Sequence, residues 1–135
     1  MDFRDTPEEA EYRAKTRVWL QEHCPAPFPR TGLLTGGPLE EIDESAETRQ
    51  RRKEWRRLLY DSGYTLQSWP KEWGGRGMRP IYDAIFNDEA AAVGAPGLGL
   101  AHLERVVMMA GTPEQREKFV MPTMRGDLHW CQGFS

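Results

Sequence analysis

Two four-residue segments of this chain carry the same helix-start signal. They read Thr6-Pro7-Glu8-Glu9 and Thr112-Pro113-Glu114-Gln115. In each segment the threonine can cap a helix, the proline suits the first helical position, and the last residue can complete a capping box. We therefore predict one helix that starts at Pro7 and another that starts at Pro113 and runs to about Val120 or Met124.

The first of these helices is expected to run toward Leu20. Prolines 25, 27 and 29 follow it, and they end the helix because a proline inside a helix removes a hydrogen bond and clashes with the preceding turn. Apolar residues recur at every fourth position and give one apolar stripe, made of Ala10, Ala14 and Val18 with Trp19 beside them.

A second helix is expected from Ala46 to Ser62, ended by Gly63. It follows a Gly-, Thr- and Pro-rich and then acidic stretch at residues 30–45, which we interpret as a long loop. The core face of this helix holds Trp55, Leu58 and Leu59. Its exposed face is basic and carries Arg49, Arg51, Arg52, Lys53, Arg56 and Arg57.

Residues 64–80 contain too many glycines and prolines for a helix and are expected to form a folded loop. The buried anchors of this loop are expected to be Tyr64, Leu66, Trp69 and Trp73. A third helix should then lie between Pro80 and Gly94, with Ile81, Ala84, Ile85 and Ala92 along it.

The segment from Leu98 to Ala110 is apolar around most of its circumference, which predicts a central helix buried between its neighbours. Gly111 ends it, and the helix that starts at Pro113 follows. The chain is thus expected to be all-α, with about five helices.

The last nine residues change period. Leu128, Trp130, Gln132 and Phe134 alternate with polar or small residues, as in a strand. A lone strand leaves its backbone groups without partners. We therefore expect that the chain is interrupted within a strand.

Length, charge and cysteine content limit the function classes. With 135 residues the chain is long enough for one domain, and its 18 Lys and Arg against 21 Asp and Glu argue against a nucleic-acid-binding surface. Cys24 and Cys131 indicate neither a disulfide framework nor a zinc site. Without a signal-like or membrane-spanning apolar run, a soluble cytoplasmic protein is expected.

Three further patterns are best interpreted as structural. The histidines at 23, 102 and 129 lack metal-ligand spacing, so no metal site is expected. The glycine-rich segment Gly74–Gly77 has no apolar strand before it, which favours a turn over a phosphate loop. The basic face at residues 49–57 is interpreted as solvated rather than as phosphate-binding.

Three segments in this order resemble the acyl-CoA dehydrogenase family. Residues 69–77, Trp-Pro-Lys-Glu-Trp-Gly-Gly-Arg-Gly, are similar to the loop after the second helix of the family. Residues 110–119 resemble its Gly-Thr-x-x-Gln helix, and residues 131–135, Cys-Gln-Gly-Phe-Ser, resemble the segment before its Glu-Pro-Gly-Ala-Gly-Ser-Asp motif. The sequence ends before that motif.

The resemblance implies a helical N-terminal domain at residues 1–127, with the loop at 30–45, and the start of a truncated β-barrel domain at 128–135. It implies FAD as cofactor, an acyl-CoA substrate and an electron-transfer flavoprotein as partners, and a homo- or hetero-oligomer. The catalytic base would lie outside this chain, so no catalytic residue is assigned and the chain alone is expected to be inactive. By position, Gln132, Phe134 and Ser135 correspond to flavin contacts, and Leu98 and His102 to residues facing the acyl pocket.

Two other function classes remain open. The chain can be a non-enzymatic helical module that pairs with a homologous subunit, for which an exposed hydrophobic face would speak. It can also be a nucleic-acid binder that works through residues 49–57, whose affinity would fall steeply with salt. Membrane association is not expected.

Overall fold

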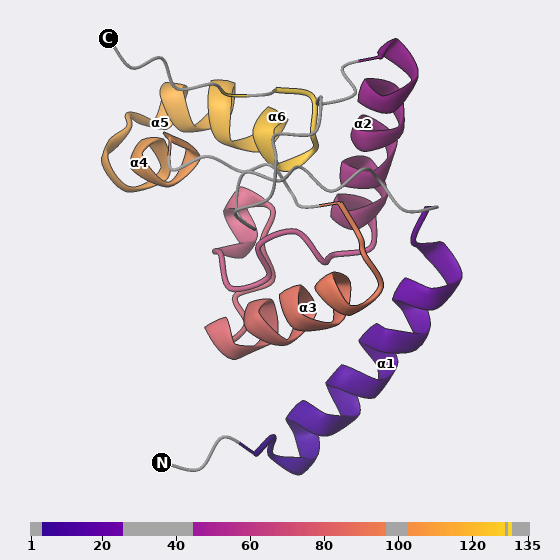
Figure 1. The fold of residues 1–135 in the computed structure, drawn as a ribbon. Coiled ribbons are helices and arrows are strands. Elements are labelled where there is room, and N and C mark those ends of the chain that lie inside the picture. Colours follow the sequence, from indigo (N-terminus) through magenta and orange to yellow (C-terminus); the bar gives the residue numbers. More distant parts are fainter. Residues whose placement is uncertain (1–3, 26–44, 97–102, 129, 131–135) are drawn as a thin grey trace, which may run out of the picture.

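The structure is a computed structural model that describes residues 4–25, 45–96, 103–128 and 130. In these residues the regular structure is helical, and it comprises five helices (Figure 1). Four of them are α1 (Pro7–His23), α2 (Ala46–Asp61), α3 (Pro80–Ala92) and α4 (Leu103–Ala110). The fifth is continuous through α5 (Pro113–Gln115), a π-helical segment η3 (Arg116–Val120) and α6 (Met121–Met124). The prediction of an all-α domain with five helices is confirmed.

Both predicted capping boxes are present. Thr6 accepts a hydrogen bond from the Glu9 amide at 3.3 Å, and the Glu9 carboxylate accepts one from the Thr6 amide at 2.9 Å. Thr112 and Gln115 exchange the equivalent bonds at 3.2 and 2.9 Å. These reciprocal bonds satisfy backbone donors that the first helical turn leaves without partners.

The first core cluster lies where α1, α2 and α3 meet. Its fully buried members are Leu20, Trp55, Leu59 and Phe86, and Leu58 packs against them. The Trp55 indole N–H donates to the Pro96 carbonyl at 3.1 Å, which ties α2 to the chain after α3. The predicted core face of α2 is therefore confirmed, and Gly63 ends the helix with a φ of +76°.

The loop between α2 and α3 is folded, as expected, and contains the short 3₁₀ turn η2 (Lys71–Trp73). Leu66 and Trp69 are buried in a second core cluster with Val120 and Met124, whereas Tyr64 and Trp73 are half-buried. A Cβ on Gly75 would lie 2.1 Å from the Trp69 carbonyl oxygen. The glycine-rich segment is thus a tight turn in which the backbone passes over itself.

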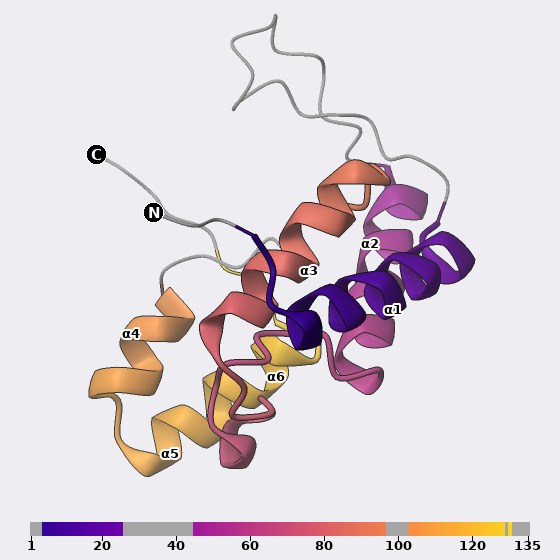
Figure 2. The same ribbon diagram turned by 90° about the horizontal axis from the view of Figure 1, so that it is seen from below.

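The apolar stripe expected on α1 is not its buried face. Ala10 and Ala14 are exposed, and Val18 is 53% exposed. The buried residues of this helix are Glu9, Thr16 and Leu20. The prediction failed for these three residues because α1 packs beside α3 (Figure 2) partly through charged side chains, with Arg13 and Arg17 bonded to Glu89. Trp19, which was expected beside the stripe, does pack against the first core cluster.

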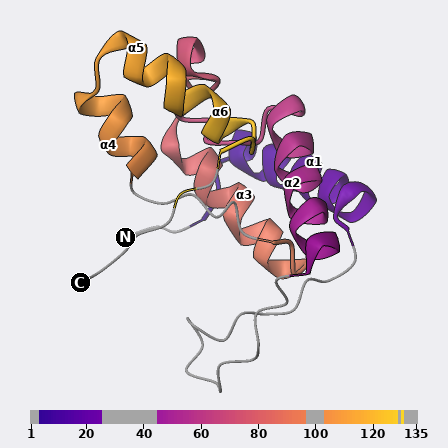
Figure 3. The same ribbon diagram turned by 90° about the horizontal axis from the view of Figure 1, so that it is seen from above.

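The expected central position of the fourth helix is also wrong for its described part. The helix α4 lies at the edge of the molecule, on the side opposite α1 (Figures 1 and 3). Val106 is 57% exposed and Met109 is 77% exposed. The inward face carries Glu104, Val107 and Met108 instead, because the described chain covers this helix on one side only.

Candidate functional site

The five residues predicted to contact flavin or the acyl group all lie outside the described residues. Leu98 and His102 directly precede α4, and Gln132, Phe134 and Ser135 follow Trp130. The structure shows how the chain next to them is held.

Trp130 anchors the chain next to the predicted flavin-contacting residues. Its indole N–H donates to the Thr123 hydroxyl at 2.8 Å, and its ring packs on Phe119 with the centroids 5.7 Å apart. Thr123 is buried and donates in turn to the Phe119 carbonyl at 2.6 Å. The segment before Gln132 is thus bound to the last helix by a specific hydrogen bond and a ring contact.

A small cavity lies near the chain that leads to Leu98. It has a volume of about 140 Å³ and is mostly apolar, with its wall formed by Trp55, Leu59, Phe86, Asn87, Ala90, Ala91, Ala95 and Pro96. Typical ligand pockets have volumes of roughly 300–1,000 Å³. This cavity is therefore too small to hold an acyl-CoA tail by itself.

The inward face of α4 buries a carboxylate. Glu104 is 1% exposed, and among the described residues its Oε2 atom has no hydrogen-bond partner. A carboxylate oxygen without a partner is costly to bury. Sequence analysis missed it because the apolar neighbours dominate the pattern, although a charged residue within an apolar helix was a usable signal.

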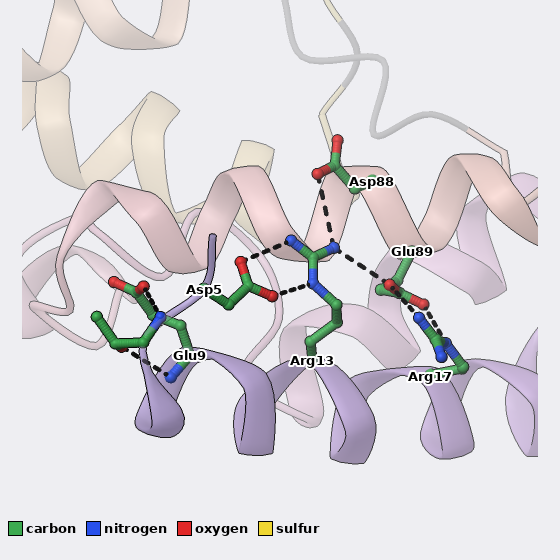
Figure 4. Close-up of polar contacts among 7 residues, drawn as sticks. Asp5, Glu9, Arg13, Arg17, Asp88 and Glu89 are labelled. Carbon is green, nitrogen blue, oxygen red and sulfur yellow. Dashed lines mark hydrogen bonds and ion pairs between the residues drawn. The ribbon is translucent and has the colours of Figure 1, made fainter. Parts of the chain in front are cut away.

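An ion-pair network joins α1 to α3 (Figure 4). Glu89, which is 5% exposed, accepts hydrogen bonds from Arg17 at 2.7 and 2.9 Å and from Arg13 at 3.2 Å. Arg13 also donates to Asp5 at 2.6 and 3.1 Å. These arginine hydrogen bonds hold the pKa of Glu89 below its usual value, and burial opposes them.

This network braces α1 against α3, because its ion pairs link the two helices. Arg13 and Arg17 stand four residues apart, so they present two guanidinium groups from one face of α1 to a single carboxylate. The pKa of Asp5 is likewise lowered by its hydrogen bond with Arg13. The i, i+4 arginine spacing was a sequence signal, but nothing local pointed to Glu89 as the partner.

A second brace holds the loop after α2. The Tyr12 hydroxyl donates to the side-chain oxygen of Gln67 at 2.7 Å. The Asp83 carboxylate accepts hydrogen bonds from the backbone N–H of Gln67 at 2.7 Å and from the backbone N–H of Ser68 at 3.1 Å. Gln67 is fully buried, so this loop is fixed from both α1 and α3 before the Trp69–Gly77 segment begins.

The remaining candidates have ordinary environments. His23 stacks on Trp19, with one ring nitrogen 2.9 Å from the Trp19 carbonyl, and burial raises the pKa of the Cys24 thiol. Among the described residues no three His, Cys, Asp or Glu side chains are grouped to hold a metal ion. No helix in that part of the chain is long and apolar enough to cross a bilayer.

The predicted flavin-contacting residues fit a flavin by their chemistry. The Ser135 hydroxyl and the Gln132 amide can donate and accept hydrogen bonds, as the polar edge of the ring requires. Phe134 has an apolar ring, and Trp130, the last described residue before these three in sequence, is hydrogen-bonded to Thr123. Together these features are compatible with a cofactor held by residues 132–135.

Comparison with known proteins identifies the class. The profile of the acyl-CoA dehydrogenase N-terminal domain matches residues 6–127. The chain is 33% identical to the acyl-CoA dehydrogenase IpdE1 of Mycolicibacterium smegmatis and 34% identical to IpdE1 of Mycobacterium tuberculosis, in each case over 93% of this chain and 32% of the relative. The chain belongs to the acyl-CoA dehydrogenase family.

Solved structures give the same result. The Tcur3481–Tcur3483 steroid ACAD superposes with a TM-score of 0.71 at 27% identity, over 96% of this chain and 32% of the other. The ChsE4–ChsE5 complex from Mycobacterium tuberculosis superposes with a TM-score of 0.68 at 27% identity, over 96% and 30%. The chain thus spans about a third of the length of these relatives.

Proposed function

We propose that this chain is the N-terminal helical part of a flavin-dependent acyl-CoA dehydrogenase, and that it contributes part of the acyl pocket and of the flavin site. Such an enzyme introduces a double bond between the α and β carbons of an acyl-CoA thioester. The observation that carries the proposal is the family match over residues 6–127. The anchored Trp130, which precedes the predicted flavin contacts, supports it further.

The division of labour follows from the resemblance. FAD, when bound, accepts the hydride that leaves the β carbon, and a carboxylate base supplied from outside this chain takes the α proton. In this chain Ser135 and Gln132 would hydrogen-bond the flavin ring, and Phe134 would pack against it. Leu98 and His102 would line the acyl pocket ahead of α4.

The proposed substrate and assembly are inferred from the descriptions of the structural neighbours. The first of the two neighbours is described as a steroid ACAD, and both are named as pairs of proteins. We therefore infer a branched or polycyclic acyl-CoA substrate, an oligomer formed with a like or a homologous subunit, and transfer of electrons to an electron-transfer flavoprotein. A cytoplasmic location accords with this chemistry.

The test uses the native protein that carries these residues, purified from its source. We expect a yellow protein that oxidises an acyl-CoA with an artificial electron acceptor, and we expect Ser135→Ala to weaken FAD binding. Residues 1–135 expressed alone should be colourless and inactive. A colourless native protein would refute the flavin assignment, and turnover by residues 1–135 alone would show that the site needs no other polypeptide.

A second candidate is a non-enzymatic helical module that pairs with a homologous subunit. The exposure of Val106 and Met109 on α4 favours it, because neighbouring exposed apolar residues are typical of interaction surfaces. Analytical ultracentrifugation of the chain with and without a homologous acyl-CoA dehydrogenase tests it. A complex that forms but shows neither flavin nor turnover would favour this function over the first.

A further inference from the structure

The helix α1 and the loop between α2 and α3 meet through three polar side chains, Tyr12, Thr16 and Gln67. Thr16 and Gln67 are fully buried, and Tyr12 is half-buried. We propose that this polar contact is a binding site for one ordered water molecule, held by the Thr16 hydroxyl and the Gln67 side-chain amide. The inference concerns the fold of the described chain and is independent of the proposed flavin site.

Thr16 lies on the inward side of α1. Tyr12, Thr16 and Leu20 follow one another at intervals of four residues, so they lie along one side of the helix. Leu20, at one end of this row, is fully buried in the first core cluster. At the other end the Tyr12 hydroxyl donates to the side-chain oxygen of Gln67 at 2.7 Å. The Thr16 hydroxyl is therefore enclosed between the apolar core and the polar contact with the loop.

Gln67 uses its backbone groups and its side-chain oxygen in bonds within the chain. Its backbone N–H donates to the Asp83 carboxylate at 2.7 Å, and its carbonyl accepts from the backbone N–H groups of Arg76 and Met78, each at 3.0 Å. Its Oε1 accepts from Tyr12. These bonds fix the residue and leave over its Nε2 group, which has no hydrogen-bond partner among the described residues.

The unpaired end of the Gln67 amide does not depend on how the amide is turned. If its oxygen and nitrogen exchanged places, Nε2 would face the Tyr12 hydroxyl and Oε1 would lose that partner. In either orientation, one polar atom of a fully buried side chain is left over. Buried polar atoms in folded proteins are nearly always hydrogen-bonded, either to protein or to ordered water.

The Thr16 hydroxyl is also unpaired. Within the described part of the chain its Oγ1 has no hydrogen-bond partner, because it lies beside the Tyr12 hydroxyl without the geometry of a hydrogen bond. Burial raises the pKa of Tyr12, and the neighbouring side chains of Thr16 and Gln67 oppose that rise. The two unpaired groups therefore lie on either side of the same phenol oxygen, where one small molecule can reach both.

Water suits the chemistry of both groups. It can accept a hydrogen bond from Nε2 of Gln67 and donate one to Oγ1 of Thr16, and buried waters typically make two to four such bonds. The three side chains are neutral, and the raised pKa of Tyr12 keeps its phenol protonated. A neutral molecule that both donates and accepts is thus favoured over an ion, which would be buried here without an opposite charge.

The water would support a strained turn of the loop. Leu66, which directly precedes Gln67, has a φ of +40°, a region of backbone conformation that is unfavourable for a leucine. Such a conformation persists only where the surrounding contacts hold it. A water between Thr16 and Gln67 adds a contact from α1 to those that Gln67 already makes with α3, through Asp83.

The first test is a crystal structure of the native protein at a resolution that shows ordered water. We expect one water within hydrogen-bond distance of both Thr16 Oγ1 and the Gln67 side-chain amide. Thr16→Val deletes the hydroxyl and keeps the shape of the side chain, so we expect the density of this water to be lost. Thr16→Ser keeps the hydroxyl and is the matched control, and it should retain the water.

A second measurement detects the water in solution and does not depend on any variant. The Thr16 methyl group would lie close to the bound molecule, so we expect a nuclear Overhauser effect between this methyl and a long-lived water. A wild-type structure in which Thr16 and Gln67 bond to each other or to another part of the polypeptide, with no water between them, would overturn the proposal. Retention of the water in Thr16→Val would equally refute the role of the hydroxyl. Neither result would affect the proposed function, which rests on other residues.

Discussion

Two buried glutamates show how differently the two sides of this molecule are held. On the side of α1 and α3, Glu89 is enclosed by hydrogen bonds from Arg13 and Arg17. On the side of α4, Glu104 is buried more completely, yet one of its oxygens has no partner within the part of the chain that the structure describes. The same helix exposes Val106 and Met109 to solvent.

The α1–α3 interface is held by ion pairs within the chain, whereas the surface of α4 suits contacts with a binding partner. The α1–α3 interface pairs its charges within the described chain, so its polar groups stabilise the fold. The inward face of α4 carries a buried carboxylate together with Val107 and Met108, and its outward face exposes Val106 and Met109. Such a pattern adds little to stability and is typical of surfaces that serve binding.

The largest effect is expected at the braced interface. Glu89→Gln removes the charge that pairs with two arginines, and we expect the free energy of unfolding to fall by about 2–3 kcal/mol. Asp88→Asn is the matched control, because Asp88 is 70% exposed and its contact with Arg13 measures 3.6 Å; it should cost less than about 0.5 kcal/mol. Urea unfolding checks both variants, and equal losses would show that the network does not act as a brace.

A change of opposite sign is expected at α4. Glu104→Leu replaces a buried carboxylate by an apolar side chain of similar volume, and we expect it to raise the free energy of unfolding by about 1–2 kcal/mol. Glu104→Gln should fall between the leucine variant and the wild type. If Glu104→Leu lowers the free energy of urea unfolding, the Glu104 carboxylate stabilises the fold. The proposed difference between Glu104 and Glu89 would then be wrong.

The braced interface should also respond to acid. The pKa of Glu89 is lowered from an ordinary value of 4.5, so the stability it contributes is fully present above that value. This contribution is lost as the pH falls through the pKa of the folded state. Unfolding free energies measured between neutral and acidic pH should therefore fall less steeply for Glu89→Gln than for the wild type. If the free energies of unfolding of Glu89→Gln and the wild type fell equally with pH, Glu89 would not be the group that causes the acid response.

The smallest effect is expected on the exposed face of α4. Val106→Ser and Met109→Ser should each change the free energy of unfolding by less than about 0.5 kcal/mol. Val120→Ala is the matched comparison, because Val120 is fully buried in the second core cluster and should cost more than about 1 kcal/mol. A large loss for Val106→Ser in thermal or urea unfolding would mean that α4 is covered in solution by another part of the chain.

Sequence reasoning succeeded where the signal was local and strong. The start of α1, the core face of α2 and the turn at Gly74–Gly77 were all predicted, because a cap, a large aromatic residue or a glycine restricts its own neighbourhood. It failed on the buried face of α1, because the helical spacing of Ala10, Ala14 and Val18 suggested an apolar face while Glu9 and Thr16 are the residues buried beside Leu20. It also missed Glu104, because periodicity counts apolar positions and does not register one charged residue among them.

The candidate site shows the same division. The family and the residues expected near flavin were indicated by short motifs, and the match over residues 6–127 confirms the family. The hydrogen bond between Trp130 and Thr123 could not be foreseen, because the two residues lie seven apart in sequence and meet only through the fold of the chain between them.

The amino-acid sequence by itself determined where α1, α2, α3 and the last helix begin, since these features depend on contacts within about four residues. The tertiary structure alone decided which face of each helix is buried. Arg13 and Glu89, for example, are 76 residues apart in sequence and bond only because α1 and α3 lie side by side. Burial and charge pairing depend on both of the segments in contact, so the sequence of one segment alone does not predict them.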